Sequence, residues 1–398
     1  MALAAGLYLL FAINFSAYRV FGDGVLYYDF MRRFFGQHVV AANVYAYAYA
    51  FGVDLWNAWF WGLSQAAIAV TGHRTVAGFS LGEVAITIAS NAAVALSAFL
   101  GWRLLRRIGL PTRASVLLAV IFGTPLYYYA TFSPSYPHAA DALALTLAAT
   151  LLLDLVDGDD STWKLLALGA CLGWLTVIRY IGFALWPGLL LPVLACRGPR
   201  RAAAVTGAAI AATGLLFLLP VLRGIPYGTP QTHPATALNL DLLAPLKMLF
   251  SLHRGLFLWT PLTAISAIGI GLLIARLRGP HRIYVIGLAT ASLLLVAAYA
   301  TDGNWWDGGW SFSQRYLTCL FPVFLLGFAE ALRRWRWLVG ILGTLAVLWS
   351  VFIGFNHAFG IPQSAGVNGI VQLYTSGQRT PHDFFHLFVS YSRFHHAF

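Results

Sequence analysis

Long apolar runs, separated by short polar or basic connections, fill most of this chain. A helix that crosses the hydrocarbon core of a bilayer needs about 20 mainly apolar residues, and eleven segments reach or approach that length. These segments are 2–20, 83–103, 114–132, 139–156, 164–179, 181–196, 202–222, 255–275, 283–300, 316–333 and 337–355. The pattern predicts an all-α, polytopic membrane protein with about 11 transmembrane helices in a single transmembrane domain, residues 1–398.

The composition supports this prediction. Hydrophobic residues make up 59% of the 398 positions and charged residues only 10%, whereas soluble domains average about 25% charged residues. The net charge of +11 does not indicate a nucleic-acid partner, because the basic residues gather in short clusters between apolar runs. The three cysteines (Cys171, Cys196 and Cys319) lie in or beside apolar runs without metal-ligand spacing. We expect them to be small buried hydrophobes, with no disulfide framework or zinc site.

The basic clusters indicate which helix ends share a side of the membrane. Five clusters follow the second, fourth, sixth, eighth and tenth apolar segments, so all lie on one side. They are Arg103/Arg106/Arg107/Arg113, Lys164, Arg197/Arg200/Arg201, Arg276/Arg278/Arg282 and Arg333/Arg334/Arg336. Because cytoplasmic loops are enriched in Lys and Arg, we expect this side to face the cytoplasm, in a bacterial cytoplasmic (inner) membrane. The N-terminus is then cytoplasmic, on an uncleaved first helix, and the C-terminal tail 356–398 is periplasmic.

The loops on the opposite, outer side are long and rich in Trp, Tyr, His, Asp and Pro. They are 21–82, 223–254, 301–315 and the tail. Long loops with polar groups are where function usually concentrates. Two runs in the first outer loop, 27–35 and 54–70, mix apolar, aromatic and charged residues, which predicts helices lying in the membrane interface. An aromatic belt that anchors the loop is a compatible alternative.

The first outer loop opens with an acid between two glycines, Gly22-Asp23-Gly24. The glycines allow backbone and substrate to approach closely, so Asp23 is our first candidate for a general base. Asp29 is the alternative, although its spacing also allows an ion pair with Arg32 or Arg33. The alternative is that Asp23 is simply a solvated acid in a loop, without a catalytic role. Two tyrosines follow and are candidate substrate-binding residues, namely Tyr27 and Tyr28.

The 301–315 loop combines flat aromatic rings, acids and a guanidinium within fifteen residues. A Trp face matches the C–H face of a sugar ring, and an Arg fork suits a phosphate. The candidate substrate-binding residues here are Trp305, Trp306, Asp307 and Trp310, with Arg315 as a phosphate ligand. The alternative is that the Trp residues only mark the interface and Arg315 only extends to it.

Further cationic candidates lie at outer helix boundaries. Arg179 lies between two apolar segments, His253 and Arg254 precede another, and His138 begins a fourth. Structural or interfacial roles explain each of them individually. Together they suit a lipid phosphate: Arg179, His253, Arg254 and Arg315 would bind the donor phosphate and stabilise its developing charge, while His138 would contact substrate. Asp23 would accept the proton of an acceptor hydroxyl that attacks the anomeric carbon, by single displacement with inversion.

These features resemble the GT-C superfamily of integral membrane glycosyltransferases. The resemblance rests on Asp23 with Tyr27, on the runs 27–35 and 54–70, and on the Ser251–Phe257 and Trp306–Leu317 stretches. It implies a catalytic acid at the opening of the first outer loop, a polyprenyl-phosphate-linked sugar as donor, and membrane lipids as surroundings. Many members carry a second acid where Gly24 stands, so no cofactor is named and a divalent metal stays an alternative. The short tail favours a lipid or glycan acceptor.

Other function classes make different predictions. A transporter or lipid flippase is expected to carry ionisable residues near the bilayer centre, whereas here they cluster at segment ends. An O-antigen ligase-like enzyme would use similar donors with its main cations on a later outer loop. A non-catalytic scaffold would not explain why the polar and aromatic residues gather in the outer loops. The sequence therefore favours an inverting glycosyltransferase that acts on hexosyl or pentosyl donors outside the cytoplasm.

Overall fold

The computed structural model describes residues 2–37, 39, 51–225, 241–301, 311–359 and 366–394. The first half contains α1 (Ala2–Phe15), α2 (Asp23–Phe34), α3 (Gly52–Thr71), β1 (Thr75–Val76), β2 (Phe79–Ser80), α4 (Leu81–Ile108), α5 (Ala114–Phe122), α6 (Leu126–Thr131), α7 (His138–Val156), α8 (Thr162–Ile178), the 3-10 helix η2 (Tyr180–Leu185) and α9 (Trp186–Arg197). The second half contains α10 (Pro199–Leu222), α11 (Ala244–Phe250), α12 (Leu256–Trp259), α13 (Leu262–Arg276), α14 (Gly279–Ala300), the 3-10 helix η4 (Arg315–Leu320), α15 (Phe321–Arg334), α16 (Arg336–Phe359), α17 (Val367–Thr375) and α18 (Pro381–Phe394).

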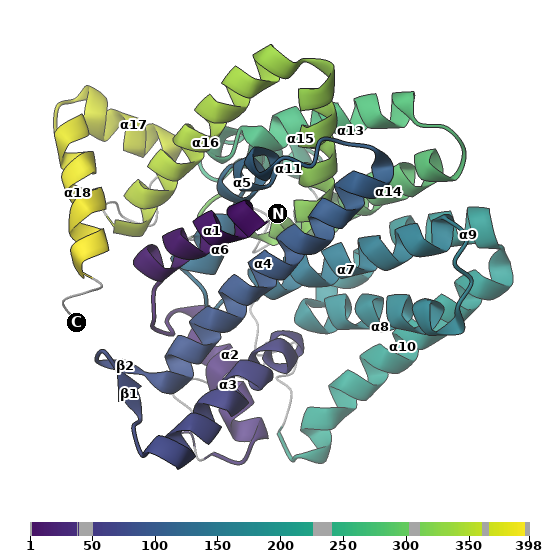
Figure 1. The fold of residues 1–398 in the computed structure, drawn as a ribbon, viewed down its shortest axis with the longest axis horizontal. Helices are drawn as coiled ribbons and strands as arrows, with labels where there is room; N and C mark the ends of the chain where they lie inside the picture. The colour runs from purple at the N-terminus through teal and green to yellow at the C-terminus, as the bar shows by residue number, and fades with distance from the viewer. Residues whose placement is uncertain are drawn as a thin grey trace.

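Each of the eleven predicted segments contains helix, which confirms the all-α membrane fold (Figure 1). Within the described residues, seven helical segments are long and apolar enough to cross a membrane, and α1, α8 and α13 are shorter apolar helices. Two predicted spans contain breaks that the apolar pattern did not show. Segment 114–132 divides into α5 and α6 before Pro125, and segment 255–275 divides into α12 and α13 before Pro261. Proline lacks the N–H that a continuing helix needs, so both breaks are local in origin.

The bundle has a buried centre and a periphery. Within the apolar stretch of each candidate span, 89% of the residues are buried in α7 and 94% in η4–α15. The buried share in α10 is only 17%. Helices α7 and α15 are therefore central, and the apolar surface of α10 is left for lipid. Central packing is close where glycines meet: the backbones of Gly269 on α13 and Gly327 on α15 touch, and a Cβ on either would collide with the other helix. Small residues permit this approach between membrane helices.

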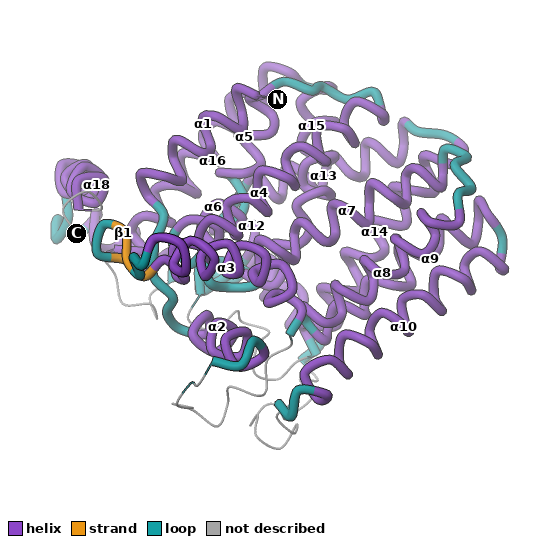
Figure 2. The backbone as a smooth tube through the Cα atoms, turned by 60° about the horizontal axis from the view of Figure 1, so that its bottom comes forward, coloured by secondary structure: helices purple, strands orange, loops and turns teal. Residues whose placement is uncertain are grey.

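Helices α2 and α3 lie at one end of the bundle, beside the two-residue hairpin strands β1 and β2 (Figure 2). These helices match the predicted runs 27–35 and 54–70, although each begins a few residues earlier. Their location in a membrane interface stays a prediction. The tail forms two helices, α17 and α18, with α18 against α1 and α16. The opposite end of the bundle consists mainly of short connections (Figure 2).

Ion pairs hold the helices together at that opposite end. Arg107 of α4 contacts Asp154 of α7 and reaches Asp157 at 2.5 Å, while Lys164 of α8 reaches Asp154 at 2.7 Å. Arg276 of α13 and Arg333 of α15 share Glu330, whose side chain is only 2% exposed. Neighbouring helices are thus joined by cations that already have carboxylate partners.

Candidate active site

The first residue of α2 is Asp23, and the backbone before it has a conformation that glycine adopts readily. Gly22 has a φ of +56°, and a Cβ there would collide with the hydroxyl of Tyr136. Gly24 lies equally close to Ser135, in the loop before α7. The glycines therefore let the start of α2 contact the 133–137 loop directly, and this contact positions the Asp23 carboxyl.

Asp23 forms an ion pair with Arg315, the first residue of η4. Arg315 Nη1 donates to Asp23 Oδ2 at 3.1 Å, across 292 residues of sequence. The Asp23 side chain is 32% exposed and that of Arg315 only 9%. The Arg315 side chain is therefore buried in the protein, whereas the Asp23 carboxyl stays accessible to solvent or a ligand. A group that accepts a proton from a substrate must be accessible in this way.

Tyrosine rings surround the Arg315 guanidinium. Its Nη2 donates to the hydroxyl of Tyr316 at 2.9 Å, and its central carbon lies 5.0 Å from the Tyr316 ring centroid and 5.7 Å from that of Tyr136. Burial raises the pKa of the Tyr136 phenol, and the negative charge of Asp23 acts in the same direction. Tyr136 therefore remains a neutral phenol beside the ion pair at physiological pH.

A second guanidinium, that of Arg179, shares the Tyr316 ring. Its central carbon lies 4.7 Å from the ring centroid. Arg179 Nη1 donates to the Tyr299 hydroxyl at 3.3 Å, and Nη2 lies 3.3 Å from Nε2 of His138. The nearest carboxylate atom, Oδ2 of Asp141, is 4.0 Å from Arg179 Nε. Two cations from different elements are thus held around one tyrosine. Arg179 contacts mainly rings and neutral polar groups, whereas Arg315 also pairs with Asp23.

A cavity of about 390 Å³ opens beside Arg315 and Gly22. Aromatic rings form much of its wall, with a few polar groups among them. It is lined by Ala17, Phe21, Gly22, Tyr128, Tyr129, Phe132, Ser133, Tyr136, Ser311, Phe312, Arg315, His357, Ala358, Phe359 and Tyr391. Ligand sites are commonly apolar hollows of about 300–1,000 Å³ with a few convergent polar groups, and this cavity fits that description.

Arg254 lies one layer behind the cavity wall. It is completely buried, with its guanidinium 4.8 Å from the Trp259 ring centroid. Trp259 packs edge-on against Phe312 and His357, which both line the cavity. The neighbouring His253 is exposed and contributes its carbonyl, which accepts from Arg254 Nη1 at 3.2 Å. Arg254 therefore does not extend to a membrane interface.

The other predicted site residues are distributed as follows. Tyr27 is buried close enough to Arg179 to interact electrostatically, and His138 is buried beside Arg179. Tyr28 packs against a cluster of Met31, Trp61 and Ile86. Asp29 pairs with Arg32 at 3.4 Å, as its spacing predicted, and burial raises its pKa against the opposing effect of Arg32 and Arg33. Trp305, Trp306, Asp307 and Trp310 lie outside the described residues.

Several residues around the ion pair were not among the predicted site residues. Tyr136 and Tyr316 flank residues that the sequence singled out, so their motifs were a usable signal. Tyr299 and His357 lie within apolar helices, and nothing local marked them. Asp54 of α3 is also unexpected: it is 1% exposed, neither carboxyl oxygen bonds a described group, and burial raises its pKa well above the usual range.

The described residues fit an anion better than a metal ion. They contain no group of three or more His, Cys, Asp or Glu side chains arranged to hold a metal. Divalent cations such as Mg²⁺ and Ca²⁺ are bound by oxygen ligands, whereas the charged neighbour of Asp23 is a guanidinium. We therefore assign no step to a metal.

The fold is similar to that of two solved membrane enzymes. ArnT from Cupriavidus metallidurans, solved with undecaprenyl phosphate bound, has a TM-score of 0.59 and 15% identity over 89% of this chain and 64% of its own. The oligosaccharyltransferase of Archaeoglobus fulgidus, in the apo form, has a TM-score of 0.54 and 11% identity over 92% of this chain and 56% of its own. The chain thus spans less than two thirds of either neighbour. These matches confirm the predicted GT-C-like fold.

The comparisons by sequence give no further assignment. No protein-family model matches the chain, and no curated protein matches it. At such low identity the structural likeness establishes the fold alone, since one fold hosts many activities. The function must therefore be argued from the site.

Proposed function

We propose that this protein is a glycosyltransferase that moves a sugar from a polyprenyl-phosphate donor to a lipid or glycan acceptor at the periplasmic face of the cytoplasmic membrane. The observation that carries the proposal is the Asp23–Arg315 ion pair beside an aromatic cavity. A carboxylate that can accept a proton and a guanidinium that can bind a phosphate lie 3.1 Å apart, so both kinds of group that this reaction uses occur at one site. The GT-C-like fold supports it, and one structural neighbour binds undecaprenyl phosphate.

The donor phosphate is assigned to the cations around Tyr316. Arg315 and Arg179 both lie over this ring, and a guanidinium fork can hold two phosphate oxygens at once. As the bond between the anomeric carbon and the phosphate oxygen breaks, negative charge grows on the leaving polyprenyl phosphate. Fixed cations in a site of low dielectric stabilise that charge strongly. Arg254, behind the cavity wall, adds positive potential, and exposed His253 is proposed to contact the phosphate from the loop.

Asp23 is assigned as the general base. The acceptor hydroxyl oxygen attacks the anomeric carbon, its proton moves to the Asp23 carboxylate, and polyprenyl phosphate departs from the opposite face. One displacement of this kind inverts the anomeric configuration. In the resting site Asp23 Oδ2 holds Arg315. When a phosphate engages Arg315, that contact weakens and the carboxylate is free to accept a hydrogen bond from the acceptor hydroxyl.

The aromatic cavity is assigned to the sugar. Its volume of about 390 Å³ lies within the range of about 300–1,000 Å³ seen for small-molecule sites. Tyr129, Tyr136 and Phe312 provide ring faces and edges, and Ser133 and His357 provide polar groups. We further propose that Trp305, Trp306, Asp307 and Trp310 complete the sugar site, with Tyr27 and His138 supporting it through Arg179. Tyr28 and Asp29 have no role in this mechanism.

The test is a transfer assay with purified protein in nanodiscs. A panel of polyprenyl-phosphate hexoses and pentoses is supplied with lipid and glycan acceptors, and release of polyprenyl phosphate is followed. Asp23→Asn should lower kcat by about 10²–10⁴-fold, the usual contribution of a general base. Asp29→Asn is the matched control, because Asp29 is on the same helix and is paired with Arg32; its turnover should stay near that of the native protein.

Two outcomes would reject parts of this proposal. Full turnover by the Asp23→Asn protein, with loss in the Asp29→Asn protein, would move the base role to Asp29. Absence of release with every donor, combined with movement of labelled lipid across liposome membranes, would support a flippase instead.

A further inference from the structure

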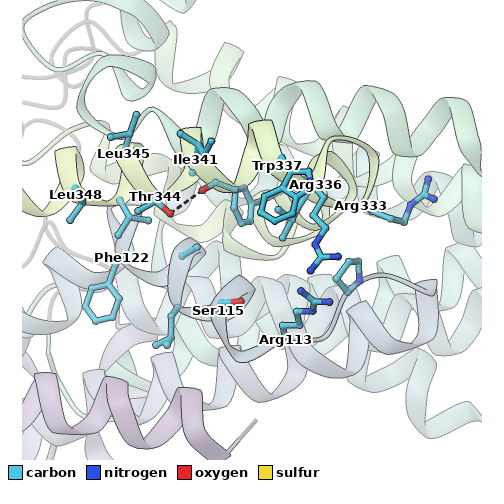
Figure 3. A pocket seen from close by; sticks show the side chains of 18 residues that line it. Arg113, Ser115, Phe122, Arg333, Arg336, Trp337, Ile341, Thr344, Leu345 and Leu348 are labelled. Carbon is cyan, nitrogen blue, oxygen red and sulfur yellow. Dashed lines mark hydrogen bonds between the residues drawn. The ribbon is translucent and has the colours of Figure 1, made fainter.

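Figure 3 shows a second hollow, which is separate from the cavity beside Arg315. This groove of about 870 Å³ runs between α5, α15 and α16. Helix α5 begins next to Arg113 and leads through α6 toward the cavity, and η4–α15 runs from Arg315 to Arg334. Twenty helical residues extend about 30 Å, so the groove mouth and the Asp23–Arg315 pair lie near opposite membrane surfaces.

The groove is apolar along its length. Its walls carry Leu118 and Phe122 from α5, Phe328 from α15, and Ile341 and Leu348 from α16. Ile341 and Leu348 are 62% and 61% exposed. Exposure of these apolar side chains is unfavourable in water and favourable against acyl chains. A groove on the outside of a membrane bundle is filled by lipid, and the remaining question is which headgroup its mouth selects.

Two arginines define that mouth. Figure 3 shows the guanidinium groups of Arg113, before α5, and Arg336, at the start of α16, pointing toward one another. In the described part of the chain, no carboxylate lies within 4.0 Å of either group. Arg333 also lines the groove but is held by Glu330 at 2.7 Å. Two like charges that face each other without a carboxylate are stabilised by an anion between them.

We infer that this groove binds an anionic glycerophospholipid, with its headgroup phosphate between Arg113 and Arg336 and its acyl chains along α5 and α16. Basic pockets between helices on the cytoplasmic side of membrane proteins select such headgroups, and the basic clusters of this chain predict that this end is cytoplasmic. A zwitterionic lipid fits less well, because none of the described residues that line the groove is an acid that could pair with its ammonium. The inference does not depend on the proposed transfer activity.

Glycines give the groove its depth. Gly343 lets α16 approach Phe328 of α15, since a Cβ there would lie 2.9 Å from that ring. Gly340 also lines the groove, but a Cβ there would meet nothing within 4 Å. A large side chain at position 340 would therefore enter the groove without disturbing the packing of α16. This position allows the groove to be filled while the arginines stay in place.

The test measures lipid binding to the delipidated full chain in detergent by native mass spectrometry. Palmitoyl-oleoyl phosphatidylglycerol should bind more tightly than palmitoyl-oleoyl phosphatidylethanolamine. The Arg113→Gln/Arg336→Gln protein should bind phosphatidylglycerol about 25-fold more weakly, at about fivefold for each arginine near a headgroup. Arg334→Gln is the matched control, since Arg334 belongs to the same basic cluster but does not line the groove; its affinity should match that of the native chain.

A second pair of variants separates groove occupancy from surface charge. Gly340→Leu should weaken phosphatidylglycerol binding with both arginines intact. Gly207→Leu on α10, where a Cβ also meets nothing within 4 Å, should have no effect. Equal affinity for the two lipids, or equal loss in the Arg334→Gln and double-arginine proteins, would overturn the inference. Displacement of phosphatidylglycerol by equimolar polyprenyl phosphate would also overturn it, by assigning the groove to the donor lipid.

Discussion

The two ends of the helical bundle use arginine in different ways. At the Asp23 end, Arg179 and Arg315 lie over Tyr316 and Arg254 lies over Trp259, within 4.7–5.0 Å of the ring centroids. Of these three, Arg315 also pairs with an acid, Asp23. At the other end, several cations contact acids that join neighbouring helices. The cations paired in this way include Arg107, Lys164, Arg201, Arg276 and Arg333.

This difference indicates that the cations at the Asp23 end serve ligand binding, whereas the paired cations at the other end serve stability. A cation against a ring is attracted to the π face, but the ring does not cancel its charge, so a phosphate can still be bound strongly. The cations paired with carboxylates at the other end are largely neutralised and mainly join helices. Arg315 is paired too, but its partner Asp23 is partly exposed and two tyrosine rings hold the guanidinium in place. Arg113 and Arg336, like Arg334, form no ion pair among the described residues, but only these two of the three line the lipid groove. Changes at the two ends should therefore affect different measurements.

After loss of the Asp23 carboxylate, removal of the Arg315 charge should produce the largest effect. Arg315→Gln leaves Asp23 without its ion-pair partner and takes a cation from the leaving phosphate. We expect kcat to fall by about 10²–10³-fold, as when one stabilising donor of a transition-state charge is lost. Arg315→Lys should be intermediate, because it keeps the charge but loses the planar fork. The measurement is polyprenyl phosphate release in nanodiscs.

The control for this prediction comes from the other end. Arg107→Gln removes an arginine that contacts Asp154 and Asp157, and turnover per folded molecule should not change. Equal losses in the Arg107→Gln and Arg315→Gln proteins would contradict the division between the two ends.

Loss of a shared carboxylate at the paired end should lower stability and leave turnover intact. Glu330→Gln replaces a buried acid that accepts from Arg276 at 3.1 Å and from Arg333 at 2.7 Å. Both guanidiniums are more than 30% exposed, so water compensates in part. We expect the free energy of unfolding to fall by about 1–3 kcal/mol, measured by denaturant unfolding in detergent. Unchanged stability with reduced turnover would assign Glu330 to the site.

The smallest effect is expected at Asp54, which is buried without a bonded partner in the described structure. Burial raises its pKa in the folded protein, while in the unfolded chain it titrates near about 3.9. Above that pH the unfolded chain releases a proton that the folded protein retains, so stability falls as pH rises. Asp54→Asn removes this penalty.

Thermal melts as a function of pH test the Asp54 prediction. The Tm of the Asp54→Asn protein should equal that of the native chain below about pH 4 and exceed it by about 1–3 °C near neutrality, for a stability gain of about 1 kcal/mol. Asp383→Asn is a useful contrast. Asp383 is on α18, and hydrogen bonds from Thr380 lower its pKa, so the sign of the pH dependence should be reversed.

Much of the fold followed from the apolar pattern, because lipid forces every spanning backbone into a helix. The two breaks, before Pro125 and before Pro261, were missed because a run of apolar residues on both sides concealed them. For the site, Asp23 and Arg315 were both identified and the structure brings them together. Arg254 was predicted to bind the donor phosphate at an outer helix boundary, with an interfacial role as the alternative. It is fully buried, and local hydropathy does not show which helices will cover a helix start. Tyr299 and His357 gave no local signal for the same reason.

The sequence by itself determined which segments are helical and where its basic clusters and aromatic loops lie, since both depend on residues close together in the chain. It also limited the candidate bases to a few acids. Only the tertiary structure decided that Asp23, and not Asp29, meets Arg315, because that contact joins residues 292 positions apart. It depends on how α2 packs against the 133–137 loop and η4. The physical reason is that helix formation is local, whereas a site of opposite charges is made by packing.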